Sequence, residues 1–185
     1  MAIFGYDTTG TYGLYDCREN ILGFQDAPAG SGTVDMITVR LAAPYSSGTI
    51  YVKCCLYDAS GNYIANSVTD ERTFANTIAE DWYDFTYSGA KPSVTASTPY
   101  IIAVWGHRSS GTTAVNVRAD NDYGSSAGKT AAEAYNGFPA SVSFSNTTRL
   151  YCIYATYTPS GGGGLSIPVA MNHYNIHINK KIRGG

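Results

Sequence analysis

Charged residues are scarce in this sequence, because Asp, Glu, Lys and Arg together make up only 14% of its 185 residues. A typical soluble domain contains about a quarter. The formal net charge of −2 argues against a nucleic-acid-binding protein, which needs a strongly basic surface. The surface must instead be built largely from Ser, Thr, Asn, Gly and the 16 tyrosines. Tyrosine suits half-buried sheets and contact surfaces, because its ring is apolar and its tip is polar.

Several signals for compartments and cofactors are also missing. The four cysteines, Cys17, Cys54, Cys55 and Cys152, form no Cys-x-x-Cys pair, so the sequence predicts no zinc site. The N-terminal residues lack the basic and apolar regions of a secretory signal. No apolar run approaches the ~18 residues of a membrane helix. We therefore expect synthesis in a cytoplasm, reduced thiols and no membrane contact.

The acidic residues do not form an obvious catalytic pair. Asp70 is followed by Glu71, and Glu80 is followed by Asp81. Glycoside hydrolysis needs two carboxylates that face each other, whereas adjacent residues of a strand point to opposite faces. We therefore expect a protein that is not an enzyme and that needs no cofactor.

Apolar residues recur at every second position in much of the sequence. In residues 49–58, Ile50, Val52, Cys54 and Leu56 alternate with positions of the opposite face, as in a half-buried strand. Residues 33–43 show the same pattern. The alternation places Cys54 in the core and its neighbour Cys55 on the outward face.

Further strands are predicted at short intervals, separated by Gly- and Ser-rich turns. Only residues 129–135, which are rich in alanine, favour a helix of one or two turns. So few crossover helices exclude a parallel sheet and predict an all-β antiparallel sandwich. We expect this domain to span residues 1–158, followed by a Gly-rich linker at 159–164 and an arm at 165–185. The further strands expected are residues 63–69, 81–88, 99–107, 114–119 and 149–158.

The arm has the pattern of a strand without a partner. It holds three basic and no acidic residues, whereas residues 1–164 hold 9 basic and 14 acidic ones. An amphipathic strand needs a host for its backbone and its apolar face. We predict that the arm adds to a sheet edge of another subunit; docking on its own domain, or no docking, are the alternatives. The assembly residues would be Ile167, Val169, Met171, Tyr174, Ile176, Ile178 and Ile182.

Two loop motifs resemble ligand sites. Residues 124–130 resemble a phosphate-binding P-loop but have one residue too few between the glycines, which favours a Gly/Ser turn. Asp120 and Asp122 resemble a fragment of a calcium-binding loop but lack the remaining ligands of an EF-hand. An Asx-rich turn is the alternative for these two residues.

Trp105, His107 and Arg108 are the candidate sugar-binding residues. They end the most apolar strand of the sequence, beside a Ser/Gly loop. At such a position a tryptophan ring and an arginine could stack on a sugar. The alternative is a tryptophan that belongs to the core and caps the sandwich.

A resemblance to a known kind of domain rests on three segments. These are VKCCLYDASGNYIANSVTDERT at 52–73, WYDF at 82–85 and PSVTASTPYIIAVW at 92–105. Residues 34–157 resemble the jelly-roll modules of secreted anchor-type and carbohydrate-binding proteins and of phage virion proteins. The resemblance implies a jelly-roll-like β-sandwich. It implies no ligand, because no family site residue can be matched by motif.

Together these observations predict a non-enzymatic structural assembly protein, a virion component such as a capsid decoration or fibre subunit. Its partner would be a further copy of the chain or another capsid protein, and its location the virion. The alternative is an extracellular carbohydrate-binding module that mediates adhesion to a glycan.

Overall fold

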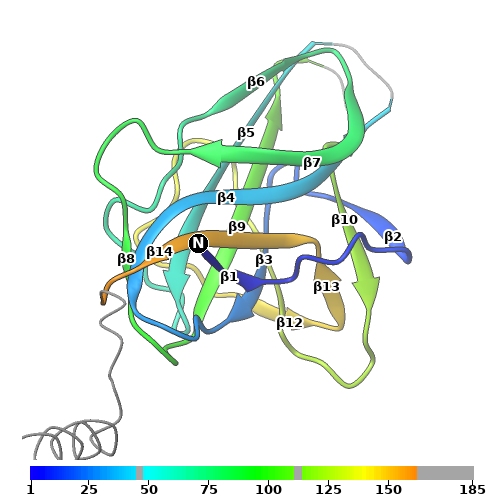
Figure 1. The fold of residues 1–185 in the computed structure, drawn as a ribbon. Coiled ribbons are helices and arrows are strands. Elements are labelled where there is room, and N and C mark those ends of the chain that lie inside the picture. The colour runs from blue at the N-terminus through cyan, green and yellow to red at the C-terminus, as the bar shows by residue number, and fades with distance from the viewer. Residues whose placement is uncertain (45–47, 111–113, 162–185) are drawn as a thin grey trace, which may run out of the picture.

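The computed structural model describes residues 1–44, 48–110 and 114–161 (Figure 1). Within these ranges there are strands and no helix. The strands are β1 (Ala2–Gly5), β2 (Gly13–Asp16), β3 (Asn20–Asp26), β4 (Gly32–Ala43), β5 (Thr49–Asp58), β6 (Arg72–Ala75), β7 (Ile78–Thr86), β8 (Ser93–Val94), β9 (Tyr100–Arg108), β10 (Asn116–Asn121), β11 (Gly128–Ala132), β12 (Ser145–Thr147), β13 (Arg149–Tyr151) and β14 (Ile153–Pro159).

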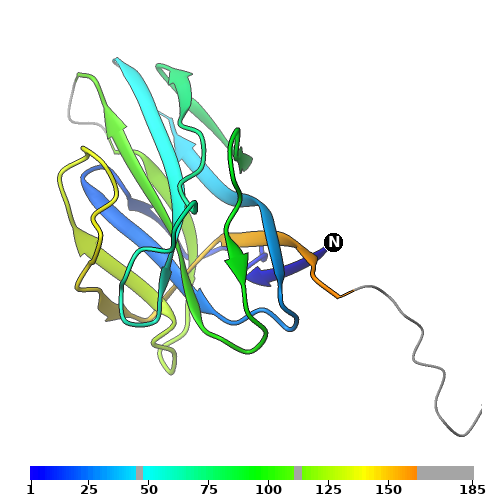
Figure 2. The same cartoon turned by 90° about the vertical axis from the view of Figure 1, so that its left-hand side faces the viewer.

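The strands form two antiparallel sheets that pack face to face (Figures 1 and 2). One sheet, sheet A, has the order β1-β14-β4-β10-β13, with β2 beside β10 and with β7 and β8 beside β4. The other, sheet B, has the order β12-β11-β3-β9-β5-β6. The predicted all-β antiparallel sandwich is therefore confirmed. In the described part of the chain, no helix has the length and apolarity needed to cross a bilayer.

The main core lies between the two sheets and follows the predicted alternation. Ile50, Val52, Cys54 and Leu56 of β5 are all fully buried in it. Residues of β4 and β9 belong to the same cluster, together with residues of β1, β3, β7, β10, β13 and β14. Removal of these side chains from water is the main force that holds the sheets together.

A second core covers the outer face of sheet B. Trp105 of β9 and Tyr57 of β5 lie in it, and the chain from Tyr135 to Phe144 packs over them. Strand β9 is therefore buried on both faces. Cys54 and Cys55 do face opposite sides of β5, but Cys55 lies in the second core and is fully buried. The prediction of an outward Cys55 was wrong because the sequence did not reveal this cover.

Two segments differ from their predicted secondary structure. Residues 129–135 are not helical: β11 pairs with β3 on one side and with β12 on the other, so pairing within the sheet overrides the helix propensity of alanine. Residues 63–69 form no ladder. Instead the buried hydroxyl of Ser67 accepts the N–H of Leu56 at 3.1 Å and donates to its carbonyl at 3.0 Å.

Ser67→Ala tests whether the Ser67 hydroxyl takes the place of a neighbouring strand in pairing with the backbone of Leu56. The variant leaves the buried N–H of Leu56 without an acceptor, which costs about 1–3 kcal/mol of the free energy of unfolding. Urea denaturation measures the loss. The matched change Ser93→Ala, at an exposed position, should stay within about 0.5 kcal/mol of the unaltered protein. Equal effects of the two variants would contradict the role of Ser67.

All four cysteines are buried and free. Cys17 and Cys152, whose pairing the sequence left open, form no disulfide. Burial raises the pKa of the Cys152 thiol to about 12, and it raises the pKa of the other three thiols too. The reactive thiolate is therefore scarce at neutral pH.

A thiol reagent should consequently label none of the four cysteines quickly in the native protein. In denaturant, where burial is lost, all four should react at the rate of an ordinary thiol. Absorbance on release of the reagent's leaving group counts the labelled sites. Rapid labelling of Cys54 in the native protein would show that the main core opens, and rapid labelling of Cys55 would show that the second core opens.

Candidate functional site

Trp105 belongs to the second core and offers no ring face to a sugar. Its side chain is fully buried. The ring centroid lies 5.1 Å from that of Tyr135 and 5.2 Å from that of Phe138. The indole Nε1–H donates to the carbonyl of Glu133 at 3.2 Å. The alternative reading of a core tryptophan is the one that the structure supports.

His107 lies on the same outer face, nearer to solvent, within a polar and aromatic cluster. Its ring stacks on Tyr135 at 5.2 Å and on Tyr51 at 6.1 Å between centroids. Nδ1 lies 2.7 Å from Oε1 of Glu19. The other Glu19 oxygen accepts the backbone N–H of Tyr135 at 2.7 Å. Glu19 thus fixes the start of the segment that covers the second core.

Arg108 is separated from the other two candidates. It is 4% exposed and follows His107, so it lies on the opposite side of β9. Its Nη1 donates to the carbonyl of Asn76 at 3.1 Å. Trp105, His107 and Arg108 therefore do not form one surface that could hold a sugar.

The contacts within this cluster shift the pKa of Glu19. Partial burial raises that pKa, but the hydrogen bonds from Tyr135 and His107 and the nearby positive charge outweigh burial, so the net shift is downward. A carboxylate with a lowered pKa stabilises the fold above its unfolded pKa, about 4.3 for glutamate. That stabilisation disappears as the pH falls through the lower pKa of the folded state.

Glu19→Gln should therefore lower the melting temperature at pH 7, because the amide lacks the charge that the cluster favours. The difference from the unaltered protein should shrink below pH 4.3 and vanish at still lower pH. Thermal unfolding followed by circular dichroism at stepwise pH measures it. Asp7→Asn, at an exposed position, is the matched control. A difference that is the same at pH 7 and pH 3 would contradict this role of Glu19.

The candidate calcium residues are occupied by structural hydrogen bonds. Oδ2 of Asp120 accepts the hydroxyl of Tyr6 at 2.8 Å, and Oδ1 accepts the backbone N–H of Thr11 at 2.6 Å. Asp122 accepts the N–H of Gly124 at 3.0 Å, as in an Asx turn. Among the described residues, no three His, Cys, Asp or Glu side chains cluster as metal ligands would.

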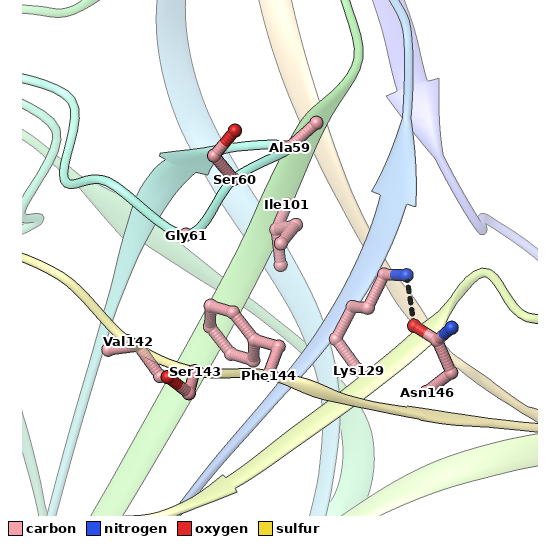
Figure 3. Close-up of a pocket in the computed structure, with 9 residues that line it drawn as sticks. All are labelled: Ala59, Ser60, Gly61, Ile101, Lys129, Val142, Ser143, Phe144 and Asn146. Atoms are coloured by element: carbon pink, nitrogen blue, oxygen red, sulfur yellow. Dashed lines mark hydrogen bonds between the residues drawn. The ribbon is translucent and has the colours of Figure 1, made fainter.

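A cavity of about 320 Å³ opens on the outer face of sheet B (Figure 3). The turn after β5 forms one wall, and the chain from Val142 to Asn146 forms the other. Ile101 of β9 and Lys129 of β11 line it from the sheet. The lining residues are Ala59, Ser60, Gly61, Ile101, Lys129, Val142, Ser143, Phe144 and Asn146.

The turn that walls the cavity is rigidly built. Asp58 accepts the N–H groups of Ser60 and Asn62 at 2.9 and 2.8 Å. Gly61 has φ = +84°, and a Cβ there would meet the carbonyl of Val142 at 2.1 Å, so only glycine fits. The Gly61 carbonyl in turn accepts the N–H of Val142 at 2.8 Å. The two walls of the cavity are therefore joined to each other.

Lys129 is the charged group of this cavity. It is 8% exposed, and its Nζ donates to Oδ1 of Asn146 at 2.6 Å and to the carbonyl of Ser126 at 3.0 Å. Figure 3 shows the lysine and Asn146 side by side at one end of the lining. Burial lowers the pKa of Lys129.

In the sequence, Lys129 stands out only as the lysine of a motif that resembles a P-loop. Residues 124–128 also match Gly-x-Ser-x-Gly. Both motifs require a turn that leads into a helix, whereas this turn leads into strand β11. What could have indicated the site is that Lys129 is the one charged residue among the small residues 124–132. Phe144 gave no signal, because its packing on Tyr57, 5.4 Å away between ring centroids, depends on the fold.

A second functional candidate is the acidic outer strand of sheet A. Strand β7 has nine residues and, in the described part of the chain, pairs with β4 alone. Of the acids between residues 70 and 84, Glu80 is bonded to Arg40 and Arg118. No ion pair involves the others within the described ranges; they are Asp70, Glu71, Asp81 and Asp84.

The predicted assembly residues Ile167, Val169, Met171, Tyr174, Ile176, Ile178 and Ile182 lie outside the described residues. Comparison of the chain with protein family models, with curated proteins and with solved structures finds no match.

Proposed function

We propose that this chain is a non-enzymatic structural assembly protein, a virion component such as a capsid decoration or fibre subunit. Residues 165–185 dock on a neighbouring subunit. The observation that carries the proposal is the acidic, outermost strand β7. A basic segment with an alternating apolar face finds there both a sheet edge and charges of opposite sign.

Charge supports β7 as the acceptor. Residues 165–185 carry three basic and no acidic residues, and the region from Asp70 to Asp84 carries five acids and one base, Arg72. Because Glu80 is already bonded to two arginines, Asp81 and Asp84 are the acids on β7 left to attract Lys180, Lys181 or Arg183. Such complementarity speeds encounter and fixes register more than it adds affinity.

The backbone of β7 is guarded against unspecific pairing. Oδ1 of Asp81 accepts the N–H of Trp82 at 2.8 Å. Arg72 donates to the Asp84 carbonyl, and the N–H of Asp70 donates to the Thr86 carbonyl, each at 2.8 Å. Charged side chains on an edge strand prevent aggregation. A basic docking strand would release Asp81 from Trp82 and pair with the freed carboxylate, which an uncharged strand could not do.

Sedimentation velocity tests the proposal. The full chain should sediment as an oligomer, and a chain lacking residues 161–185 as a monomer. Ile176→Asp and Ile178→Asp should each weaken assembly strongly, because a charge would enter an apolar contact. The matched changes Asn175→Asp and Asn179→Asp should alter little besides the salt dependence.

Asp81→Lys provides the test of the acceptor strand. It should weaken assembly of the full chain and leave the melting temperature of the truncated chain almost unchanged. A monomeric full chain at every concentration would contradict assembly itself. An oligomer that persists in Asp81→Lys would contradict β7 as its acceptor.

Carbohydrate binding in adhesion is the second candidate function. The observation that favours it is the cavity beside Lys129. This cavity replaces Trp105 as the candidate sugar site, because Trp105 is buried.

A further inference from the structure

The ammonium group of Lys129 is a buried positive charge beside a cavity. Its two hydrogen-bond acceptors, the Ser126 carbonyl and Oδ1 of Asn146, are both neutral. No carboxylate within the described ranges forms an ion pair with it. A lysine has three N–H donors, so one donor remains after these two bonds. Proteins seldom bury a lysine without a partner of opposite charge.

The cavity supplies room for that partner. Its volume of about 320 Å³ is at the lower end of the range of small-molecule sites, roughly 300–1,000 Å³. Phe144 and Ile101 contribute apolar surface, and Ser60 and Ser143 contribute hydroxyl groups. This combination suits one sugar ring, which has C–H faces as well as hydroxyls.

The site is also formed before any ligand arrives. The bond between Gly61 and Val142 joins its walls, and Phe144 is held by its contact with Tyr57. The hydrogen bond from Lys129 to Oδ1 of Asn146 holds the ammonium group in place. A rigid site loses little conformational entropy on binding.

We propose that this cavity binds a sugar that carries an anionic group, such as a carboxylate or a sulfate. The anionic group pairs with Lys129, and the sugar ring packs on Phe144. The cavity lies on sheet B, whereas the proposed docking strand lies at the edge of sheet A. The sugar site therefore does not depend on the proposed assembly.

Isothermal titration of the full chain with three probes tests the proposal. Glucuronate and N-acetylglucosamine 6-sulfate distinguish a carboxylate from a sulfate, and glucose is the neutral control. At least one charged sugar should bind, at least tenfold more tightly than glucose, and added salt should weaken it. Absence of binding by both charged sugars, or equal binding of glucose, would overturn the proposal.

Two variants locate the site. Lys129→Met keeps the length of the side chain, removes the charge and should weaken binding at least tenfold. Asn146→Asp places a carboxylate beside Lys129; it should raise the melting temperature and also weaken binding at least tenfold, because it takes the ligand's place. Lys91→Met, which removes a surface charge bonded to Asp35, should leave binding within twofold.

If the affinity of Asn146→Asp for the charged sugar stays within threefold of that of the unaltered chain, the proposal is overturned. This holds even if Lys129→Met proves unable to fold. The same result in a folded Lys129→Met would do so too. Nuclear magnetic resonance shifts on titration should centre on Lys129, Phe144 and Gly61, and shifts centred on β7 instead would place the sugar elsewhere.

Discussion

The burial of β9 on both of its faces is the constraint on which the rest of this structure depends. One face, with Ile102 and Val104, packs into the core between the sheets, and the other, with Ile101 and Trp105, packs under the second core. A strand of this kind needs a cover on its outer side, because exposed apolar surface of that size would be unfavourable. The chain from Tyr135 to Phe144 provides the cover, and Glu19 ties its first residue to the sheet.

The same cover shapes the outer face of sheet B. It takes Trp105 out of contact with solvent, and where it passes the turn at Gly61 it leaves a cavity instead of a closed core. Lys129 reaches that cavity because β11 extends sheet B beyond β3. The acidic strand β7 belongs to the other sheet, so the proposed assembly strand and the proposed sugar site lie on different sheets of the molecule.

The sequence was informative wherever one face of a strand was apolar and the other polar. The alternation of Ile50, Val52, Cys54 and Leu56 predicted β5 and its buried face, and β4 was found in the same way. Strand β9 was predicted instead from its continuous apolar run. Strands β3 and β11 lacked that contrast, since a glycine interrupts β3 and since glycine and alanine occupy most of β11. The second core could not be predicted, because Tyr135 and Phe138 reach Trp105 only through the folded path of the chain. The candidate cavity was missed for the same reason.

Native-state hydrogen exchange of the full chain tests most directly whether the cover is an integral part of the fold. The amides to follow are those of β9 and that of Val142, which donates to Gly61 across the cavity. If the second core folds together with the sandwich, Val142 should exchange only through global unfolding, with the same free energy of opening as the β9 amides. Exchange of Val142 through a local opening, with β9 still protected, would show that the cover is an independent loop and would contradict this account.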